Sequence, residues 1–298
     1  MSGELYTISL NRLLMRQLLY FICLFLIATL PLQSLSAQEI DCKAQDKQVF
    51  EKYIKYIASA EAISKVSLLQ QTAEFFLGKP YVAGTLDTHE TEKLVVNLSE
   101  FDCVTFIETV IALTNTVADK QQTLEDFAAQ LQKIRYRNGI LTDYASRLHY
   151  TSEWTDNNVE KGILKPVTFA ENELETKTIN FMSTHRSAYA ALKADDSMLA
   201  QIKSIESVIN ERGGFYFLPK NKINRYADKI PHMAVIAFTT SIKGLDTTHT
   251  GFAYRKNGKL AFIHASSLKN KVVIDEKSIS EYCMSQQSCT GLIVMEVR

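Results

Sequence analysis

The stretch "HTGFAYRKNGKLAFIHASS", residues 249–267, indicates two β-strands joined by a tight turn. The Asn-Gly pair at 257–258 is typical of a two-residue hairpin loop, because both central residues of that turn have positive φ. The register that follows places His249 and His264 on one face of the hairpin, as diagonal neighbours roughly 7–8 Å apart. A slip of one residue would move them to opposite faces. The sequence therefore predicts two adjacent imidazoles, with Gly251 leaving open space between them.

Further β-rich runs, separated by turn residues, surround this hairpin. They are "GFYFLP", "AVIAFTT", "VVID" and "LIVMEV". Helical periodicity dominates the earlier part of the chain. It covers residues from about 46 to 77, from 99 to about 116, and most of 124–209, with loops expected at "RNGILTDY" and "TDNNVEKG" and a short strand at "KLVVNL". Helices followed by strands predict an α+β fold, in which N-terminal helices pack on an antiparallel sheet.

No internal repeat and no linker rich in Gly, Ser or Pro divides the chain after its N-terminal region. We therefore expect one domain, residues 38–298, with a mostly helical insertion at about 120–209. Acidic and basic residues balance at 33 each, and no basic cluster is interleaved with aromatic residues, which argues against nucleic acid as a partner. Neither His-x-x-x-His nor Cys-x-x-Cys occurs, so we expect no metal and no cofactor. We further expect a monomer.

The N-terminal region has the features of an export signal. Arg12 and Arg16 precede the apolar run "LLYFICLFLIATL", and small residues lie near Ala37. This pattern predicts a cleavable signal peptide, residues 1–37, and a periplasmic or secreted protein without a membrane-inserted segment after cleavage. A membrane anchor is the alternative, but the apolar run ends at Pro31, short of the roughly 20 residues that span a membrane.

Export changes how the cysteines are interpreted, because exported proteins can keep disulfides. After signal cleavage four remain, at positions 42, 103, 283 and 289. The last two flank "MSQQS", a spacing that a loop could close into a bridge. Two bridges among the four cysteines would neutralise Cys103, and this alternative stays open from the sequence.

Cys103 lies in "NLSEFDCVTFIETVIAL", residues 97–113, and two interpretations compete for it. It heads an apolar series with helical spacing, which indicates a buried structural residue. However, Ser99 and Asp102 form a capping-box pattern that places Cys103 in the first helical turn, where the helix dipole favours a thiolate. The dipole contributes only about 0.3–1 kcal/mol, less than one pKa unit, and Asp102 opposes it. A nucleophilic Cys103 therefore needs an imidazole partner, which the predicted histidine pair could supply unless those histidines are mere surface residues.

Several motifs resemble a known group of enzymes. "FDCVTFIE", "HTGFA" and "FIHAS" are similar to the NlpC/P60 group of papain-like cell-wall hydrolases. "GKPYVAGTL", "IRYRNG", "SRLHYTSEW", "FMSTHRSAY" and "GLDTTHTGFAY" resemble its DUF1460 branch, which is associated with N-acetylmuramoyl-L-alanine amidase activity. The resemblance runs from about Phe75 to the C-terminal strands. One departure is "IPHMAVIAF", where such domains have a Gly-Asp turn before the strand.

The resemblance implies roles for individual residues. Cys103 would be the nucleophile, His249 its general base and later acid, and His264 the residue that orients His249. Backbone N–H groups at the helix start, including that of Cys103, would stabilise the oxyanion.

The resemblance also suggests residues that contact substrate. The hydroxyl of Tyr81 would line the site, as in similar domains. Arg147 and Tyr150 in "SRLHY" would bind substrate, the arginine by gripping a peptide carboxylate. A purely structural ion pair is the alternative for Arg147. The remaining histidines at 149, 185 and 232 are interpreted as structural or exposed.

Together these expectations describe a secreted cysteine amidase that cleaves the bond between N-acetylmuramic acid and L-alanine in peptidoglycan fragments. Two alternatives remain from the sequence. One is an endopeptidase that cuts within the stem peptide, as many NlpC/P60 relatives do. The other is a non-catalytic module that binds muropeptides. The sequence leaves open whether intact wall or soluble anhydro-muropeptide is the substrate, and which stem length is preferred.

Overall fold

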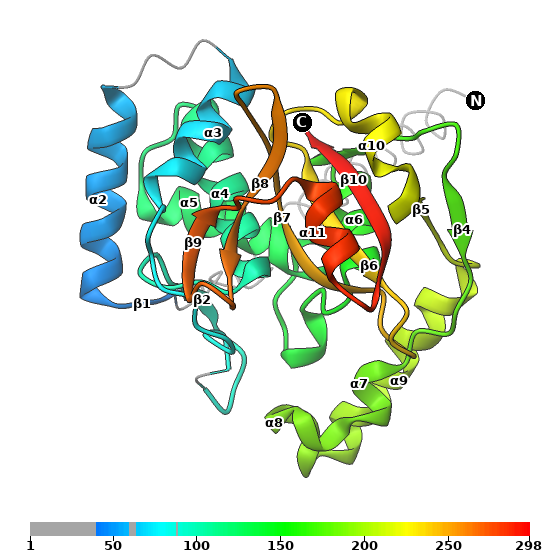
Figure 1. Ribbon diagram of the computed structural model, residues 1–298. Coiled ribbons are helices and arrows are strands. Elements are labelled where there is room, and N and C mark those ends of the chain that lie inside the picture. The colour runs from blue at the N-terminus through cyan, green and yellow to red at the C-terminus, as the bar shows by residue number, and fades with distance from the viewer. Residues whose placement is uncertain (1–39, 60–63, 88) are drawn as a thin grey trace, which may run out of the picture. The chain divides into compact units, whose positions relative to one another are not determined.

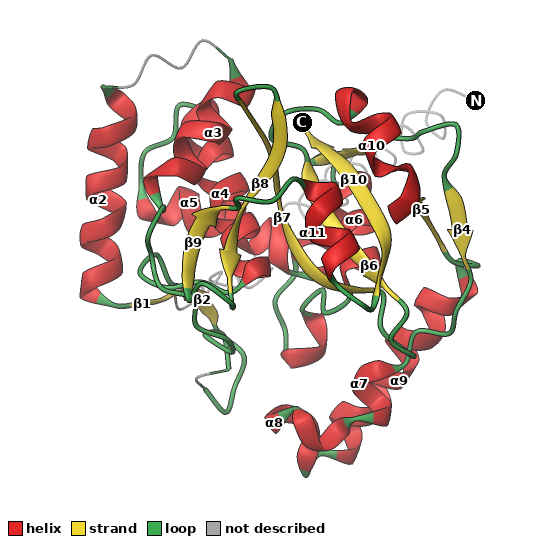
Figure 2. Cartoon of the chain, in the orientation of Figure 1, coloured by secondary structure: helices red, strands yellow, loops and turns green. Residues whose placement is uncertain are grey.

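An antiparallel sheet built mainly from the C-terminal part of the chain organises the fold (Figure 2). The computed structural model describes residues 40–59, 64–87 and 89–298, so the predicted signal peptide lies outside the described residues. The strand order is β4-β5-β10-β6-β7-β8-β9, with β3 also paired to β10. The strands are β3 (Leu164–Pro166), β4 (Glu173–Glu175), β5 (Phe215–Pro219), β6 (Val235–Thr240), β7 (Thr247–Lys256), β8 (Lys259–Ser266), β9 (Lys271–Ile274) and β10 (Cys289–Val297).

Helices occupy most of the described chain before β5 (Figure 1). They are α2 (Ala44–Ala58), α3 (Lys65–Phe75), α4 (Cys103–Ala118), α5 (Leu124–Arg135), α6 (Thr151–Glu160), α7 (Phe181–Thr184), α8 (Ala190–Lys193) and α9 (Asp196–Glu211). Two short helices, α10 (Ile223–Tyr226) and α11 (Ile279–Ser285), lie among the later strands, and β1 (Ile40–Cys42) pairs in parallel with β2 (Leu94–Val96). The described chain is thus a mixed α/β protein with an antiparallel main sheet. None of its described helices is long and apolar enough to cross a membrane.

The β7–β8 hairpin has the register that its turn predicted. Asn257 and Gly258 have φ of 51° and 77°, and Lys256 pairs with Lys259. The ladder between the described residues of β7 and β8 ends at Phe252 and Ile263, although β7 begins at Thr247 and β8 runs on to Ser266. The hydrogen-bonded ladder therefore ends before His249 and His264, although Gly251 stays packed against Ile263 and His264, so the open space predicted at Gly251 is filled.

Side chains alternate between the two faces of the sheet. Phe252 and Ile263 belong to the main core, which the helices α2 to α5 cover. Phe238 and Phe262 belong to a second core on the other face, where α10 and α11 pack. Figure 1 shows α11 over the strands and α3, α4 and α5 grouped together elsewhere against the sheet. A third, smaller cluster lies in the helical segment around α9.

Helix α4 is buried nearly all round rather than along one stripe. The predicted series is buried at Phe106, Val110 and Leu113, but Ile107 and Ile111 on other faces are buried as well. The reason is that α4 contacts α3, α5 and the strands β7 and β8 at once. A helix that is apolar on every side is typical of a protein centre.

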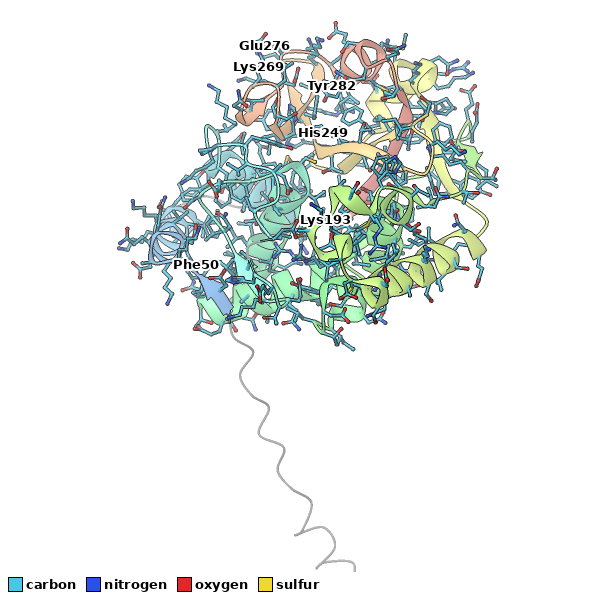
Figure 3. All side chains as sticks on the ribbon, turned by 90° about the horizontal axis from the view of Figure 1, so that it is seen from below. Phe50, Lys193, His249, Lys269, Glu276 and Tyr282 are labelled. Atoms are coloured by element: carbon cyan, nitrogen blue, oxygen red, sulfur yellow. A yellow bond between two sulfur atoms is a disulfide. The ribbon has the colours of Figure 1, made fainter. Side chains whose placement is uncertain are left out.

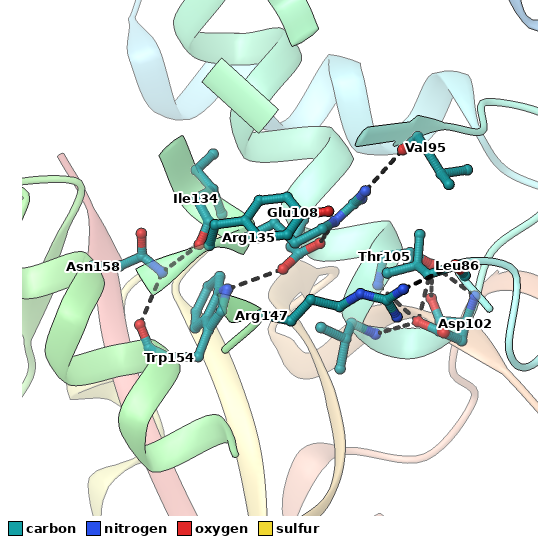
Figure 4. A network of polar contacts seen from close by, with 12 residues as sticks. Leu86, Val95, Asp102, Thr105, Glu108, Ile134, Arg135, Arg147, Trp154 and Asn158 are labelled. Atoms are coloured by element: carbon teal, nitrogen blue, oxygen red, sulfur yellow. Dashed lines mark hydrogen bonds and ion pairs between the residues drawn. The ribbon is translucent and has the colours of Figure 1, made fainter. Parts of the chain in front are cut away.

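The segment before β5 is less helical than its sequence predicted, and one of its expected loops is helical. "TDNNVEKG" does not form a loop, since α6 continues to Glu160. Asn158 is fully buried and donates to the backbone oxygens of Ile134 (3.1 Å) and Trp154 (2.8 Å), as Figure 4 shows. Tertiary hydrogen bonds thus override the low helix propensity of asparagine. The strands β3 and β4 also interrupt the stretch that was predicted to be helical.

The cysteine alternatives are decided by the structure. Cys283 and Cys289 form a disulfide between α11 and the start of β10. Cys42 and Cys103 are both free. The arrangement with two bridges is therefore not formed, and the thiol of Cys103 remains available.

Candidate active site

Cys103 is the first residue of α4, and its neighbour Asp102 caps the helix. The Asp102 carboxylate accepts hydrogen bonds from the N–H groups of Val104 (3.0 Å) and Thr105 (2.7 Å), and the Thr105 hydroxyl accepts from the Asp102 N–H (2.9 Å). The predicted capping box was wrong in its residues, because Ser99 instead donates its hydroxyl to a buried aspartate in α2. The cap lies three residues later than expected, which moves Cys103 to the exact start of the helix.

The capping pattern restricts which helix-start amides can stabilise an oxyanion. Asp102 already occupies the N–H groups of Val104 and Thr105. The N–H of Cys103 is directed at its own sulfur, where it lowers the pKa of the thiol. Several N–H groups at the helix start were predicted to stabilise the oxyanion. The N–H of Cys103 is the best placed of them to contact a substrate oxygen.

The thiol of Cys103 is protonated in the resting site. Burial, reinforced by the adjacent negative charge of Asp102, raises the pKa of Cys103 to about 12. Hydrogen bonds from the backbone N–H and the hydroxyl of Thr250 lower it in part. The helix start thus does not suffice to form a thiolate, in agreement with the small size of the dipole effect.

The two histidines of the hairpin contact each other directly. His249 Nε2 and His264 Nδ1 are 2.6 Å apart, so the predicted adjacency is confirmed. The rings of Phe238, Phe262 and Tyr282 surround His249, with centroids 6.2, 6.3 and 6.0 Å from its own. Figure 3 labels His249 and Tyr282 near one another. The pair therefore lies in an aromatic environment that limits access of water to it.

Both imidazoles are neutral at physiological pH. Burial lowers the pKa of His249 and of His264 well below the usual value. The neighbouring His264 lowers the pKa of His249 further, whereas Asp275 opposes that change. A neutral imidazole beside a thiol is the form that can accept a proton.

Thr250 connects the start of α4 to the strand that carries His249. Its hydroxyl donates to the backbone oxygen of Cys103 at 3.0 Å, so Thr250 faces α4, whereas His249 points to the face covered by α11. Helix α4 packs on the face opposite to the histidine pair, and its first residue adjoins β7 at Thr250, the neighbour of His249. Between these described residues the sulfur makes no hydrogen bond to His249, which is usual for a site without substrate.

Tyr282 on α11 packs beside the histidine pair, with its ring centroid 6.0 Å from those of both His249 and His264. After burial, the charges of Asp275 and Cys103 are the next causes that raise the pKa of Tyr282, to about 12. Its ring centroid lies 4.8 Å from that of Phe262, beneath the histidines. No sequence pattern predicted this residue, because α11 reaches the site only through the order of the strands.

Asp275 was also missed by the sequence reasoning. Its Oδ2 lies 3.3 Å from His264 Nε2, and its Oδ1 accepts from the N–H of Lys277 at 2.8 Å. The register of β8 with β9 pairs His264 with Val273, so Asp275 is a diagonal neighbour of His264 on the same face. Its signal was the aspartate that ends the strand "VVID". The loop between β8 and β9 is longer than the Asn-Gly turn and does not fix the register in the same way.

Tyr81 contacts the segment that leads into α4. A parallel bridge joins Tyr81 to Phe101, two residues before the nucleophile candidate, and the Tyr81 N–H donates to Asn270 at 3.0 Å. After burial, the charges of Cys103 and Asp102 are the next causes that raise the pKa of Tyr81. The half-buried phenol therefore adjoins the start of α4.

Arg147 is held by acidic partners from another loop. Its Nε and Nη2 donate to the two carboxylate oxygens of Glu92 at 2.6 and 2.7 Å, and its Nη1 donates to Asp87 at 2.7 Å. A further bond from Nη2 reaches the backbone oxygen of Leu86, as drawn in Figure 4. These contacts match the structural ion pair that the sequence left as the alternative. A substrate carboxylate would have to displace one of these acidic partners.

Tyr150 is similarly occupied. It is 3% exposed, its hydroxyl donates to Glu206 at 2.7 Å, and the same oxygen accepts from the N–H of Met182 at 2.9 Å. Both hydrogen-bonding functions of the phenol are thereby used within the small core around α9. In this arrangement Tyr150 stabilises that segment and presents no free polar group.

Comparison with known proteins places the chain in a family. A family model described as N-acetylmuramoyl-L-alanine amidase-like matches residues 71–291. The chain belongs to this family. No curated protein matches the sequence.

Solved structures of similar proteins support the family assignment. An N-acetylmuramoyl-L-alanine amidase from Bacteroides uniformis is 33% identical, with 78% of this chain and 99% of that chain covered and a TM-score of 0.69. A protein from Bacteroides fragilis described as a putative xylanase is 36% identical, with 76% and 99% covered and a TM-score of 0.70. A DUF1460 protein from Legionella pneumophila is 23% identical, with 85% and 94% covered and a TM-score of 0.63, and shows the fold alone.

For this member of the N-acetylmuramoyl-L-alanine amidase-like family, the candidate site comprises one thiol, two imidazoles and a carboxylate. The matched residues 71–291 contain all four groups. Within the ranges that the structure describes, no group of three or more His, Cys, Asp or Glu residues could hold a metal ion. The arrangement can move a proton from sulfur to an imidazole and stabilise the positive charge that results.

Proposed function

We propose that this protein is a cysteine amidase that hydrolyses the amide bond between N-acetylmuramic acid and L-alanine in peptidoglycan fragments. The membership of the chain in the amidase-like family and the amidase from Bacteroides uniformis support the substrate class. One observation supports the mechanism: the Thr250 hydroxyl donates to the backbone oxygen of Cys103 at 3.0 Å, and the adjacent residue in β7 is His249, itself bonded to His264. This connection supports a thiol and an oriented imidazole that act together at one end of the sheet.

The reaction follows from the protonation states of these groups. As the Cys103 sulfur attacks the carbonyl carbon of the lactyl group, its proton passes to His249 Nδ1. The oxygen that becomes negative is stabilised by the N–H of Cys103. The C–N bond then breaks, His249 returns the proton to the leaving amine of L-alanine, and a thioester remains.

Water then hydrolyses the thioester, and His249 and Cys103 again transfer the proton. His249 takes a proton from water as its oxygen bonds to the thioester carbon, and the C–S bond breaks. The proton then returns to sulfur, which restores the neutral thiol. The products are the free carboxylate of the sugar and a stem peptide with a free N-terminus. His264 holds the ring of His249 throughout and stabilises its charged form less than a carboxylate in direct contact would.

The neutral resting state distinguishes this site from one that stores a thiolate. The pKa of Cys103 is raised and that of His249 is lowered, so neither group is charged before substrate arrives. Proton transfer then accompanies the attack on the carbonyl rather than preceding it. This form limits alkylation or oxidation of the resting thiol, since the thiolate is the reactive species.

We extend the proposal to fold family and location. A cysteine at the start of a helix, followed in the chain by a hairpin with two histidines, supports a papain-like fold of the NlpC/P60 type. The sequence pattern of residues 1–37 supports export to the periplasm or the medium. We propose a monomer that acts on wall fragments and has no nucleic-acid partner.

A digest of a defined muropeptide tests the proposal. Wild-type protein should release free N-acetylmuramic acid-containing sugar and the intact stem peptide, and Cys103→Ala should release neither, as read by mass spectrometry. Cys42→Ala is the matched control, because Cys42 is the other free cysteine and lies in β1. Shortened peptides would indicate an endopeptidase instead. Binding of the muropeptide without any turnover would indicate a non-catalytic module.

A further inference from the structure

We propose that Asp275 is a positioning residue that sets the tautomers of both histidines and thereby leaves Nδ1 of His249 free to accept the thiol proton. Asp275 has no contact with substrate in this proposal and acts only through His264. The inference rests on the proposed function for its effect on turnover. The tautomers themselves can be measured without any substrate.

The assignment starts from the carboxylate. An ionised carboxylate only accepts hydrogen bonds, so the proton between Asp275 Oδ2 and His264 Nε2, 3.3 Å apart, belongs to the imidazole. A neutral imidazole carries one proton, and Nδ1 of His264 is therefore an acceptor. Its partner at 2.6 Å, Nε2 of His249, must donate. Nδ1 of His249 is then left without a proton, which is the state that a general base requires.

The opposite set of tautomers would disable the site. In it His264 would donate from Nδ1 to His249 Nε2, and His249 would carry its proton on Nδ1. Its Nδ1 could then no longer accept from sulfur. The two sets keep the same bond between the histidines, so that bond alone does not choose between them. Asp275 favours the productive set of tautomers, because in the opposite set its carboxylate oxygen would face the lone pair of His264 Nε2 and the two would repel.

Among the neighbours of the two histidines, Asp275 is the group that determines their tautomers. His264 is 1% exposed, and its ring stacks on Phe262 with a centroid distance of 4.1 Å. The titratable groups that contact the pair are Asp275, which follows β9, and Tyr282 from α11, whose ring centroid lies 6.0 Å from those of both histidines. Of these, Asp275 is the one that forms a hydrogen bond with either histidine. In a site with little water, no solvent molecule readily replaces a missing acceptor.

Asp275 also has a structural function, which the test must separate from the proposed one. Its Oδ1 accepts from the N–H of Lys277 at 2.8 Å, and its own N–H donates to the backbone oxygen of Phe262 at 2.9 Å. The first of these bonds is an Asx-turn that asparagine also forms, and serine forms a weaker equivalent. Both substitutions therefore keep the turn to different degrees.

Asparagine should preserve the turn better than serine does, but it should change the tautomers of the histidines more. In Asp275→Asn, Oδ1 stays with Lys277 and the amide NH₂ faces His264 Nε2, which favours the wrong tautomers. In Asp275→Ser the side chain is too short to reach His264, and neither set is enforced. We expect kcat to fall on the order of 10²–10⁴-fold in the asparagine variant, as for a carboxylate whose loss gives the wrong tautomer. The serine variant should lose less, on the order of 10-fold.

The experiment combines kcat and KM with the ¹⁵N chemical shifts of histidine in the full-length protein. The expected result is a proton on Nε2 of both histidines in the wild type and on Nδ1 of both in Asp275→Asn, with KM unchanged. Asp41→Asn is the matched control, since Asp41 bonds the exposed His89 at 2.6 Å in a different part of the chain. Unchanged tautomers in Asp275→Asn, or a larger loss of kcat in the serine variant, would overturn the inference. A wild type without turnover would refute the proposed function, while the chemical shifts would still test Asp275.

Discussion

Two polar regions of the molecule both contain residues of family motifs, and they differ in whether the fold leaves the polar groups of those residues unpaired. Both contain residues that family motifs single out, Cys103 and His249 at the open end of the sheet, and Arg147 and Tyr150 in "SRLHY". At the sheet end, the thiol and one nitrogen of His249 are left without a strong partner. In the other region, the guanidinium and the phenol are held by acidic side chains. The comparison teaches that a motif residue is free for chemistry only where the fold leaves its polar groups unpaired.

Burial reinforces the contrast. Glu92 is 2% exposed in its side chain and the partner Arg147 is 11% exposed, so their bidentate pair is shielded from solvent. Burial of the thiol and the imidazoles instead keeps them neutral. Loss of solvation thus disfavours the charged form in both regions, and Arg147 stays charged because its acidic partners Glu92 and Asp87 outweigh that cost.

The largest effect is expected from removing the base. His249→Ala should lower kcat on the order of 10⁴-fold or more, because the buried neutral thiol has no other group to take its proton. Steady-state kinetics on a defined muropeptide measure this, with thermal unfolding as the check on folding. His89→Ala is the control, since His89 is exposed and paired with Asp41. Turnover within tenfold of wild type would remove His249 from the mechanism.

A smaller effect, on stability rather than chemistry, is expected in the other region. Arg147→Met leaves the buried carboxylate of Glu92 unpaired and should lower the free energy of unfolding by about 3 kcal/mol. Urea denaturation measures the loss, and the double variant with Glu92→Leu should recover most of it. The kcat and KM of the folded Arg147→Met protein should stay within about threefold of wild type.

This prediction separates the two roles that the sequence left open for Arg147. A KM raised tenfold or more, together with unchanged stability, would show that the guanidinium binds substrate. The proposed comparison between the two regions would then fail, because both would contribute directly to the reaction.

A third effect concerns the pH dependence of stability. Burial lowers the pKa of His149 to about 3, and its Nε2 bonds the backbone oxygen of Tyr144 at 2.8 Å. The unfolded chain binds the proton near pH 6.5 while the folded chain does not, so the contribution is complete above that pH and is lost as pH falls toward 3. Wild type should lose about 1.4 kcal/mol from this residue between pH 7.5 and pH 5.5.

His149→Gln isolates that contribution, because glutamine can keep the hydrogen bond but does not titrate. Urea denaturation at both pH values should show a shallower pH dependence in the variant. Equal slopes for wild type and variant would mean that His149 is not held neutral by burial.

The smallest expected effect is on the resting thiol. Alkylation of Cys103 by iodoacetamide should rise about tenfold per pH unit between pH 6 and 9, since the raised pKa leaves little thiolate in that range. Peptide mapping measures the rate at Cys103 separately from that at Cys42. A rate that is already constant at pH 6 would show a preformed thiolate and would contradict the neutral resting state.

The sequence could predict the hairpin and the histidine pair because local rules determine them. An Asn-Gly turn fixes the register within a few residues, and the register fixes which side chains share a face. The helix that contains Cys103 was also predicted, although its capping box was assigned three residues too early, to Ser99 and Asp102 instead of Asp102 and Thr105.

What the sequence could not provide depends on contacts between distant segments. Arg147 meets Glu92 and Asp87 from a loop more than fifty positions earlier, and Tyr282 reaches the site from α11. Neither contact has a local pattern. Asp275 was predictable only in part. Its strand was predicted from the sequence, but the loop between β8 and β9 does not determine how that strand pairs with β8.

The central claim, that Cys103 attacks the carbonyl carbon of the lactyl group, is tested most directly by trapping the intermediate. Wild-type protein would be mixed with a defined N-acetylmuramoyl peptide, quenched in acid during turnover, and its peptides analysed by mass spectrometry. We predict an adduct on the peptide that contains Cys103, with the mass of N-acetylmuramic acid less one water. An adduct that carries amino acids of the stem peptide, or an acyl group on any other residue, would contradict the claim.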